Sequence, residues 1–81
     1  MWQIAMARSP FVVSFARAVR RHRLRVGLTQ ESLAELAGLH PTYVSMVETA
    51  KKVPTMDAAQ RLAKGLGVKL SKLVAEAETA T

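Results

Sequence analysis

The chain contains no cysteine, which excludes disulfide bonds, thiolate zinc sites and cysteine nucleophiles. It has no apolar run near the roughly 20 residues that a membrane-spanning helix needs. The opening stretch M-W-Q-I-A-M-A is apolar but shorter than a secretory signal. These absences suit a reducing compartment, and we expect a cytoplasmic protein with no membrane partner.

Residue patterns that support catalysis are scarce as well. Neither His22 nor His40 has a further ligand at the spacing of a metal site. The serine, histidine and acidic residues form no triad signature, and the chain has no glycine-rich phosphate loop. We therefore expect no enzyme, no metal, no cofactor and no small-molecule substrate.

Acidic residues are outnumbered, with six Asp and Glu against twelve Lys and Arg, a net charge of +6 and a pI of about 10.6. No acid falls between Arg8 and Arg25, a stretch that holds six arginines. Such a basic surface attracts nucleic-acid phosphates through counterion release. A solvated helix face would carry the same charge, and a membrane surface would need a broad apolar face opposite it.

Apolar residues make up 49% of the 81 residues, enough for the core of one small domain. They recur at helical spacing and never alternate like a strand, so we predict an all-α fold of five helices. Candidate caps are Ser9, Thr29, Thr55 and Ser71. With the glycines and prolines, they place the helices at about 10–26, 30–37, 41–49, 56–66 and from Ser71 onward.

The domain is expected to span 9–75, after a flexible N-terminal extension at 1–8 and before a frayed tail at 76–81. Trp2 and Ile4, in the extension, either begin a disordered start or pack on a partner subunit. The inward stripe of the first helix is predicted to be Val12, Phe15, Ala16, Val19, Arg23 and Val26. That of the fourth helix is predicted to be Met56, Ala59, Leu62, Ala63 and Leu66.

The stretch 30–48 has the pattern of two short helices crossing over a tight turn. Gly38 suits the left-handed conformation that the turn requires, and Ala34 is small enough for the crossing point. Positions where such a pair buries side chains hold Leu33, Ala37, Leu39, Val44 and Val47. Together with Gly38 and Ala34 these make seven positions, and all seven have the residue types and spacing of a helix-turn-helix, which we therefore predict.

Three stretches carry a resemblance to the Cro/CI-type (Xre) helix-turn-helix regulators: G-L-T-Q-E-S-L-A-E-L-A-G-L, Y-V-S-M-V-E and R-L-A-K-G-L-G-V-K-L-S-K-L. The resemblance covers about 11–74 and implies a five-helix, lambda-repressor-like domain that binds double-stranded DNA. Small single-domain members include the controller proteins of restriction-modification systems, whose recognition helices H-P-T-Y-V-S resembles.

The resemblance also implies roles for individual residues. The helix at about 40–49 would enter the major groove, with base contacts from Pro41, Thr42, Ser45 and Met46. DNA backbone contacts would come from Gln30, Tyr43, Lys51 and Lys52. Two alternatives stay open, since Tyr43 could lean onto the protein surface and Met46 could belong to the core.

Relatives often pair an arginine late in the first helix with the glutamate that ends the recognition helix. Here these residues are Arg23 and Glu48, so we expect a partly buried structural ion pair. The sequence departs from the family pattern at Pro41, where a polar base reader is common, and at His22, where an apolar residue is common. Gly65 stands where alanine is common. Thr49-Ala50 replaces the usual x-Gly, which predicts either a left-handed Ala50 or a longer helix.

The end of the chain has more apolar residues than one short helix needs. The family forms a twofold dimer interface in this region, which implies a homodimer through Leu66, Val68, Leu70, Leu73 and Val74. Their alternative role is to close the core. A twofold dimer would place two recognition helices one DNA turn, roughly 34 Å, apart and would bind a near-palindromic operator.

The sequence thus predicts a dimeric, sequence-specific transcriptional regulator, such as a repressor or a controller protein. Two other functions remain open. An antitoxin would bind a toxin protein and regulate its own operon, and an adaptor would use its helix-turn-helix to bind only protein.

Overall fold

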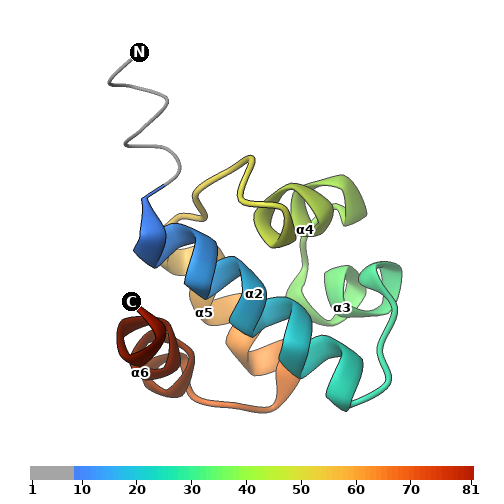
Figure 1. Ribbon diagram of the computed structural model, residues 1–81. Coiled ribbons are helices and arrows are strands. Elements are labelled where there is room, and N and C mark those ends of the chain that lie inside the picture. Colours follow the sequence, from blue (N-terminus) through green and yellow to red (C-terminus); the bar gives the residue numbers. More distant parts are fainter. Residues whose placement is uncertain (1–8) are drawn as a thin grey trace.

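The computed structural model describes residues 9–81, and this part of the chain forms five helices and no strand (Figure 1). The helices are α2 (Pro10–Arg25), α3 (Gln30–Ala37), α4 (Pro41–Glu48), α5 (Met56–Leu66) and α6 (Leu70–Ala80). The predicted all-α class is confirmed. The expected N-terminal extension, with Trp2 and Ile4, lies outside the described residues.

Local capping explains where most helices start and stop. The hydroxyls of Ser9, Thr29 and Thr55 each accept a hydrogen bond from the backbone N–H three residues later, which begins α2, α3 and α5. Gly38 and Gly67 end α3 and α5 in the left-handed conformation, with φ of 68° and 75°. These boundaries agree with the predicted ones.

The core lies where α2 packs against α6 and α3 packs against α4 and α5. Its largest fully buried apolar side chains are Val19, Leu33, Val44, Val47, Leu62 and Leu73. Gly65 lies where α5 meets α3, and a Cβ atom there would be 2.9 Å from Cδ1 of Leu33. The glycine at this helix-interior position therefore serves close packing between the two helices.

Helix α6 differs from the prediction at both ends. It begins at Leu70 after Lys69, which makes no side-chain cap bond, so the predicted cap at Ser71 is wrong. It continues to Ala80, so the expected frayed tail at 76–81 is also wrong. Ala77 is 1% exposed and extends the apolar stripe of α6, while Glu76 bonds to α2. Contacts with α2 thus hold the final turns in place.

Two residues of the predicted inward stripes face solvent instead. Met56 is 84% exposed because it is the first residue of α5, whose inner face begins at Ala58 and Ala59. Val26 is 50% exposed because it follows the last turn of α2. None of the helices within residues 9–81 is long and apolar enough to cross a membrane.

Candidate nucleic-acid interface

Helices α3 and α4 pack closely across a short turn. The side chains that the two helices bury are at most 1% exposed: Leu33 and Ala34 of α3, and Val44 and Val47 of α4. The Leu39 N–H donates to the Ala34 carbonyl at 2.9 Å, which closes the turn around the left-handed glycine. Burial of one side of α4 leaves its opposite side to face outward.

The outward side of α4 is polar but uncharged. Thr42 is exposed, while Pro41, Ser45 and Met46 are half-buried. The charged residue of this helix, Glu48, is buried. His40 precedes the helix, and its Nδ1 accepts a hydrogen bond from the Thr42 N–H at 3.1 Å. The side chains on this surface therefore offer two hydroxyl groups and apolar contacts.

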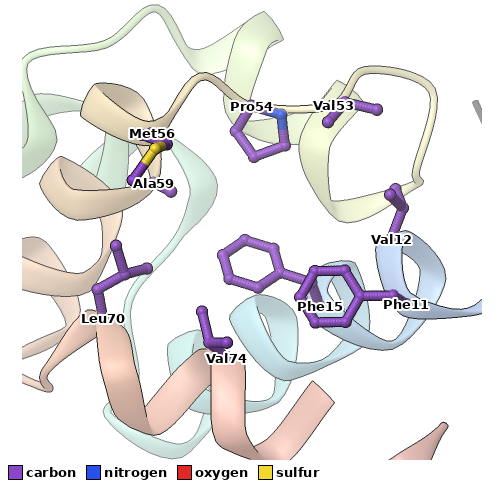
Figure 2. A pocket seen from close by; sticks show the side chains of 9 residues that line it. All are labelled: Phe11, Val12, Phe15, Val53, Pro54, Met56, Ala59, Leu70 and Val74. Atoms are coloured by element: carbon purple, nitrogen blue, oxygen red, sulfur yellow. The ribbon is translucent and has the colours of Figure 1, made fainter. Parts of the chain in front are cut away.

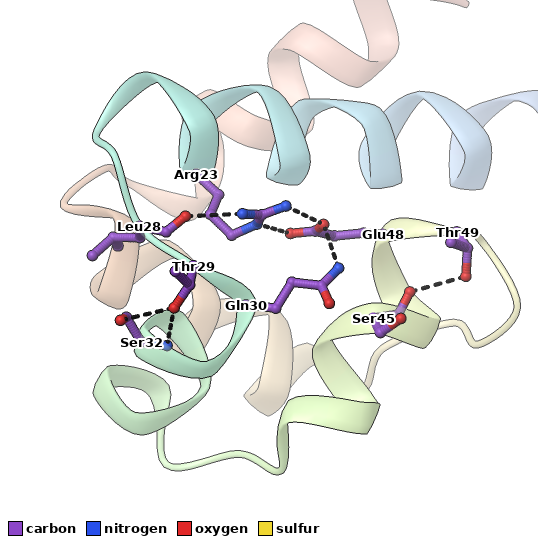
Figure 3. Close-up of polar contacts among 8 residues, drawn as sticks. All are labelled: Arg23, Leu28, Thr29, Gln30, Ser32, Ser45, Glu48 and Thr49. Atoms are coloured by element: carbon purple, nitrogen blue, oxygen red, sulfur yellow. Dashed lines mark hydrogen bonds and ion pairs between the residues drawn. The ribbon is translucent and has the colours of Figure 1, made fainter.

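A buried ion pair joins α2 to the end of α4 (Figure 3). Arg23 Nε donates to Glu48 Oε2 at 2.6 Å, and Nη2 donates to Oε1 at 3.0 Å. The two side chains are 9% and 0% exposed. The third guanidinium nitrogen, Nη1, donates to the Leu28 carbonyl at 2.8 Å. The hydrogen bond to Glu48 raises the pKa of Arg23, so the arginine expected in this pair is held as a cation.

Gln30 lies on the same carboxylate. Its Nε2 donates to Glu48 Oε1 at 3.1 Å, so the side-chain amide that we expected on a phosphate is turned toward the protein (Figure 3). The backbone N–H groups of Gln30 and Glu31 precede the first intrahelical bond of α3. They leave the positive end of this helix able to bind an anion.

Tyr43 adopts the second of its two predicted orientations. Its ring packs against the core, and its hydroxyl accepts a hydrogen bond from the Thr55 N–H at 3.4 Å. The Lys52 ammonium lies 6.0 Å from the centre of the ring. Tyr43 thus contacts the loop between α4 and α5 at Lys52 and at Thr55.

That loop presents two lysines directly after α4. Ala50 adopts φ of 59°, the left-handed option of the two that the sequence left open. The N–H groups of Lys51 and Lys52 both donate to the Met46 carbonyl, at 2.9 and 3.2 Å. Both lysine side chains are exposed. The turn therefore leaves two exposed positive charges in the loop that follows α4.

His22 belongs to the contact between α2 and α6 and lies outside this surface. It is 2% exposed, and its Nε2 lies 3.1 Å from each Glu76 carboxylate oxygen. Arg21 donates to the same carboxylate at 2.7 Å. Hydrogen bonds from Arg21 and then His22 lower the pKa of Glu76 from 4.5 to about 2. Within residues 9–81, no group of three potential metal-ligating side chains comes together.

The predicted dimer residues do not share one free surface. Leu73 is 0% and Leu66 is 4% exposed, so both belong to the core of the single chain. Their burial supports the alternative role of closing the core, and their part in a dimer interface stays a prediction. Val68, Leu70 and Val74 are partly buried against it.

An apolar groove, which includes Leu70 and Val74 of the predicted dimer residues, lies between α2, α5, α6 and the loop before α5 (Figure 2). It has a volume of about 180 Å³ and is lined by Phe11, Val12, Phe15, Val53, Pro54, Met56, Ala59, Leu70 and Val74. Phe11, Val53 and Met56 are 38%, 51% and 84% exposed. The helical pattern did not single out Phe11, at the start of α2, or Val53, in the loop, and it assigned Met56 to the core instead of to this groove.

Comparison with known proteins gives consistent matches. A family model described as Helix-turn-helix matches residues 19–73. The chain is 41% identical over 59 residues to the control protein C.SmaI of Serratia marcescens, a match that covers 73% of this chain and 70% of that protein. The restriction-modification controller protein C.AhdI from Aeromonas hydrophila superposes with a TM-score of 0.75 at 34% identity, covering 76% of this chain and 94% of that one. The clp gene regulator ClgR from C. glutamicum shares the fold, with a TM-score of 0.81 at 24% identity over 88% and 92% of the two chains.

Proposed function

Because the chain belongs to the Xre-type helix-turn-helix family of DNA-binding transcriptional regulators, we propose that it binds a near-palindromic operator as a homodimer. The observation that carries this proposal is the outward side of α4, together with the exposed Lys51 and Lys52 in the loop that follows it. The family and the lambda-repressor-like fold predicted from the motifs are confirmed. The operator, the contacts and the dimer are the proposal.

Sequence would be read by α4 in the major groove. Thr42 would contact a base edge through its hydroxyl or a thymine methyl through its own methyl group, and Ser45 would donate or accept one hydrogen bond. Pro41 and Met46 would make apolar contacts. This helix has no arginine, lysine, asparagine or glutamine. We therefore expect the shape and deformability of the operator to supply much of the specificity.

Backbone phosphates would bind at the two edges of this surface. Lys51 and Lys52 would bind phosphates at the end of α4, since both ammonium groups are exposed there. At the other edge, a phosphate would accept hydrogen bonds from the free N–H groups at the start of α3, beginning with Gln30. Tyr43 would act mainly by holding the loop that carries the lysines.

The homodimer would form through the apolar groove, with a second copy of the chain as its occupant. Three large apolar side chains exposed around one groove are typical of an interaction surface. A twofold contact buries the same patch on both subunits and doubles the number of base contacts. Such doubling suits α4, which offers few base-reading groups of its own.

Two of the similar proteins are named for a control function. C.AhdI is called a restriction-modification controller protein, and C.SmaI is called a control protein. We propose that this chain is a regulator of the same controller type. A restriction endonuclease gene under an operator that the chain occupies would support this assignment.

Selection from a randomised pool of duplexes tests the proposal as a whole. The wild-type protein should enrich a near-palindrome whose half-sites are centred about 10–10.5 base pairs apart. Enrichment of unpaired single half-sites would contradict the dimer. No enrichment at all would contradict operator binding and would favour a protein partner.

A further inference from the structure

Exposed arginines of α2 line two different hollows of the molecule. Arg17 lines a hollow of about 210 Å³ together with Thr49 and Ala50, at the end of α4. Arg21 and Arg25 line a separate hollow with residues of α6. The arginine-rich stretch is therefore not one uniform basic face, and Arg17 is placed beside the DNA-binding helix.

The hollow at Arg17 includes Thr49, which follows the last residue of α4. Thr42, Ser45 and Thr49 follow one another at intervals of three and four residues and so lie on one side of a helix. The Thr49 hydroxyl donates to the Ser45 carbonyl at 2.9 Å, which ties this end of the row together (Figure 3). After Thr49, the left-handed turn at Ala50 leads directly to Lys51. A DNA strand that follows this row past the end of α4 would come to Arg17.

The charge of Arg17 is available to a ligand. Its side chain is exposed, and the ion pairs among residues 9–81 involve Arg21, His22, Arg23, Arg61 and Lys72. The nearest carboxylate in the hollow, Glu48, already accepts hydrogen bonds from Arg23 on both oxygens and from Gln30 on one. No acidic side chain in this part of the chain therefore competes with a phosphate for Arg17.

From this placement we propose that Arg17 binds a DNA backbone phosphate, next to the phosphate that Lys51 would bind. A planar guanidinium suits bidentate binding of a phosphate, whereas lysine acts as a point charge. Helix α2 would thus add a phosphate contact from outside the helix-turn-helix itself. The inference rests on the proposed operator binding and adds a residue to it.

Two matched variants test this inference on a duplex that the wild-type protein has enriched from the random pool. Arg17→Ala and Arg25→Ala each remove one exposed positive charge from α2. If Arg17 binds a phosphate, the slope of log affinity against log salt should become less negative for Arg17→Ala, by about 0.9 per subunit. Arg25→Ala should keep the wild-type slope. Circular dichroism would confirm that both variants are folded.

Duplexes with single neutral methylphosphonate linkages locate the contact. Neutralising the linkage that Lys51 binds should weaken binding by the wild type and leave the affinity of Lys51→Ala unchanged. Neutralising a neighbouring linkage should weaken binding by the wild type and leave the affinity of Arg17→Ala unchanged. Equal slopes for Arg17→Ala and Arg25→Ala, or no linkage that distinguishes Arg17→Ala from wild type, would overturn the inference. In those cases the wild type still binds, so operator binding itself would stand. Failure of the wild type to bind any duplex would overturn both.

Discussion

The Arg23 guanidinium and the Glu48 carboxylate meet through two parallel hydrogen bonds of 2.6 and 3.0 Å, in a pair that is almost fully shielded from solvent. This contact ties α2 to the last residue of α4. Gln30, at the start of α3, donates to the same carboxylate. One buried carboxylate thus links α2, α3 and α4, the helices that orient the proposed DNA-binding surface, and the first prediction concerns its removal.

Glu48→Gln should lower the free energy of unfolding by about 3–5 kcal/mol, because it leaves the Arg23 charge buried without its partner. Urea unfolding would measure the loss. Arg61→Ala is the matched control, since Arg61 pairs with Asp57 at side-chain exposures of 50% and 71%. An exposed pair of this kind contributes at most about 1 kcal/mol. Similar losses for the two variants would show that Arg23 and Glu48 are not a buried structural pair.

The contact between Glu76 and α2 should make stability depend on pH. A carboxylate whose pKa is lower in the folded chain stabilises the fold above its unfolded pKa, and this contribution disappears as the pH falls toward the folded value. For Glu76 the window runs from 4.5 down to about 2. The stability difference between wild type and Glu76→Gln should therefore be constant near neutral pH and shrink to less than about half by pH 3.

Urea midpoints at several pH values would measure that difference. Glu78→Gln is the control, because Glu78 is exposed on the same helix and makes no ion pair within residues 9–81. Its midpoint should follow the wild type throughout. A difference between wild type and Glu76→Gln that grows as the pH falls would contradict the assigned role of Glu76.

Ala50→Gly should raise stability by about 0.5–1 kcal/mol. Ala50 adopts φ of 59°, where a Cβ atom is strained and glycine is not. The gain is partly offset by the greater freedom of glycine in the unfolded chain. Ala75→Gly, at an exposed position inside α6, should instead lose about 1 kcal/mol. Thermal unfolding would measure both, and two losses of equal size would contradict strain at Ala50.

Met56→Asp should convert the proposed dimer to monomers. Met56 is the most exposed side chain of the groove, and a carboxylate in the first turn of α5 favours that helix, so the fold should persist. Sedimentation equilibrium would measure the association state. Leu36→Asp introduces the same charge at a leucine that is 61% exposed and outside the groove, and it should remain dimeric. Dimers of both variants would place the interface elsewhere.

Local patterns were enough to predict the helix-turn-helix. The hydroxyls of Thr29 and Thr55 and the glycines at 38 and 67 act within one turn of their own helices, so their effect can be recognised in a single stretch of sequence. The burial of Leu33 and Val44 follows from helical spacing alone. The expected pairing of Arg23 with Glu48 came from family resemblance, since the two residues are 25 positions apart.

Features that depend on distant neighbours were missed. Glu76 was assigned to a frayed tail because its partner His22 lies 54 residues earlier. The hydrogen bond from Gln30 to Glu48 was not predicted because the two residues are 18 positions apart. The sequence left both a core role and a dimer role open for Leu73, because an apolar residue has the same pattern whether a core or a partner buries it, and the structure buries it in the core.

The central claim is that α4 and the lysines after it bind a specific operator, and a salt titration tests it most directly. Affinity for the enriched duplex and for a scrambled duplex of equal length would be measured from 50 to 200 mM salt. We predict tighter binding of the enriched duplex at every salt concentration and a slope of about −0.9 for each phosphate neutralised. Equal affinity for the two duplexes, or affinity that does not change with salt, would contradict the account.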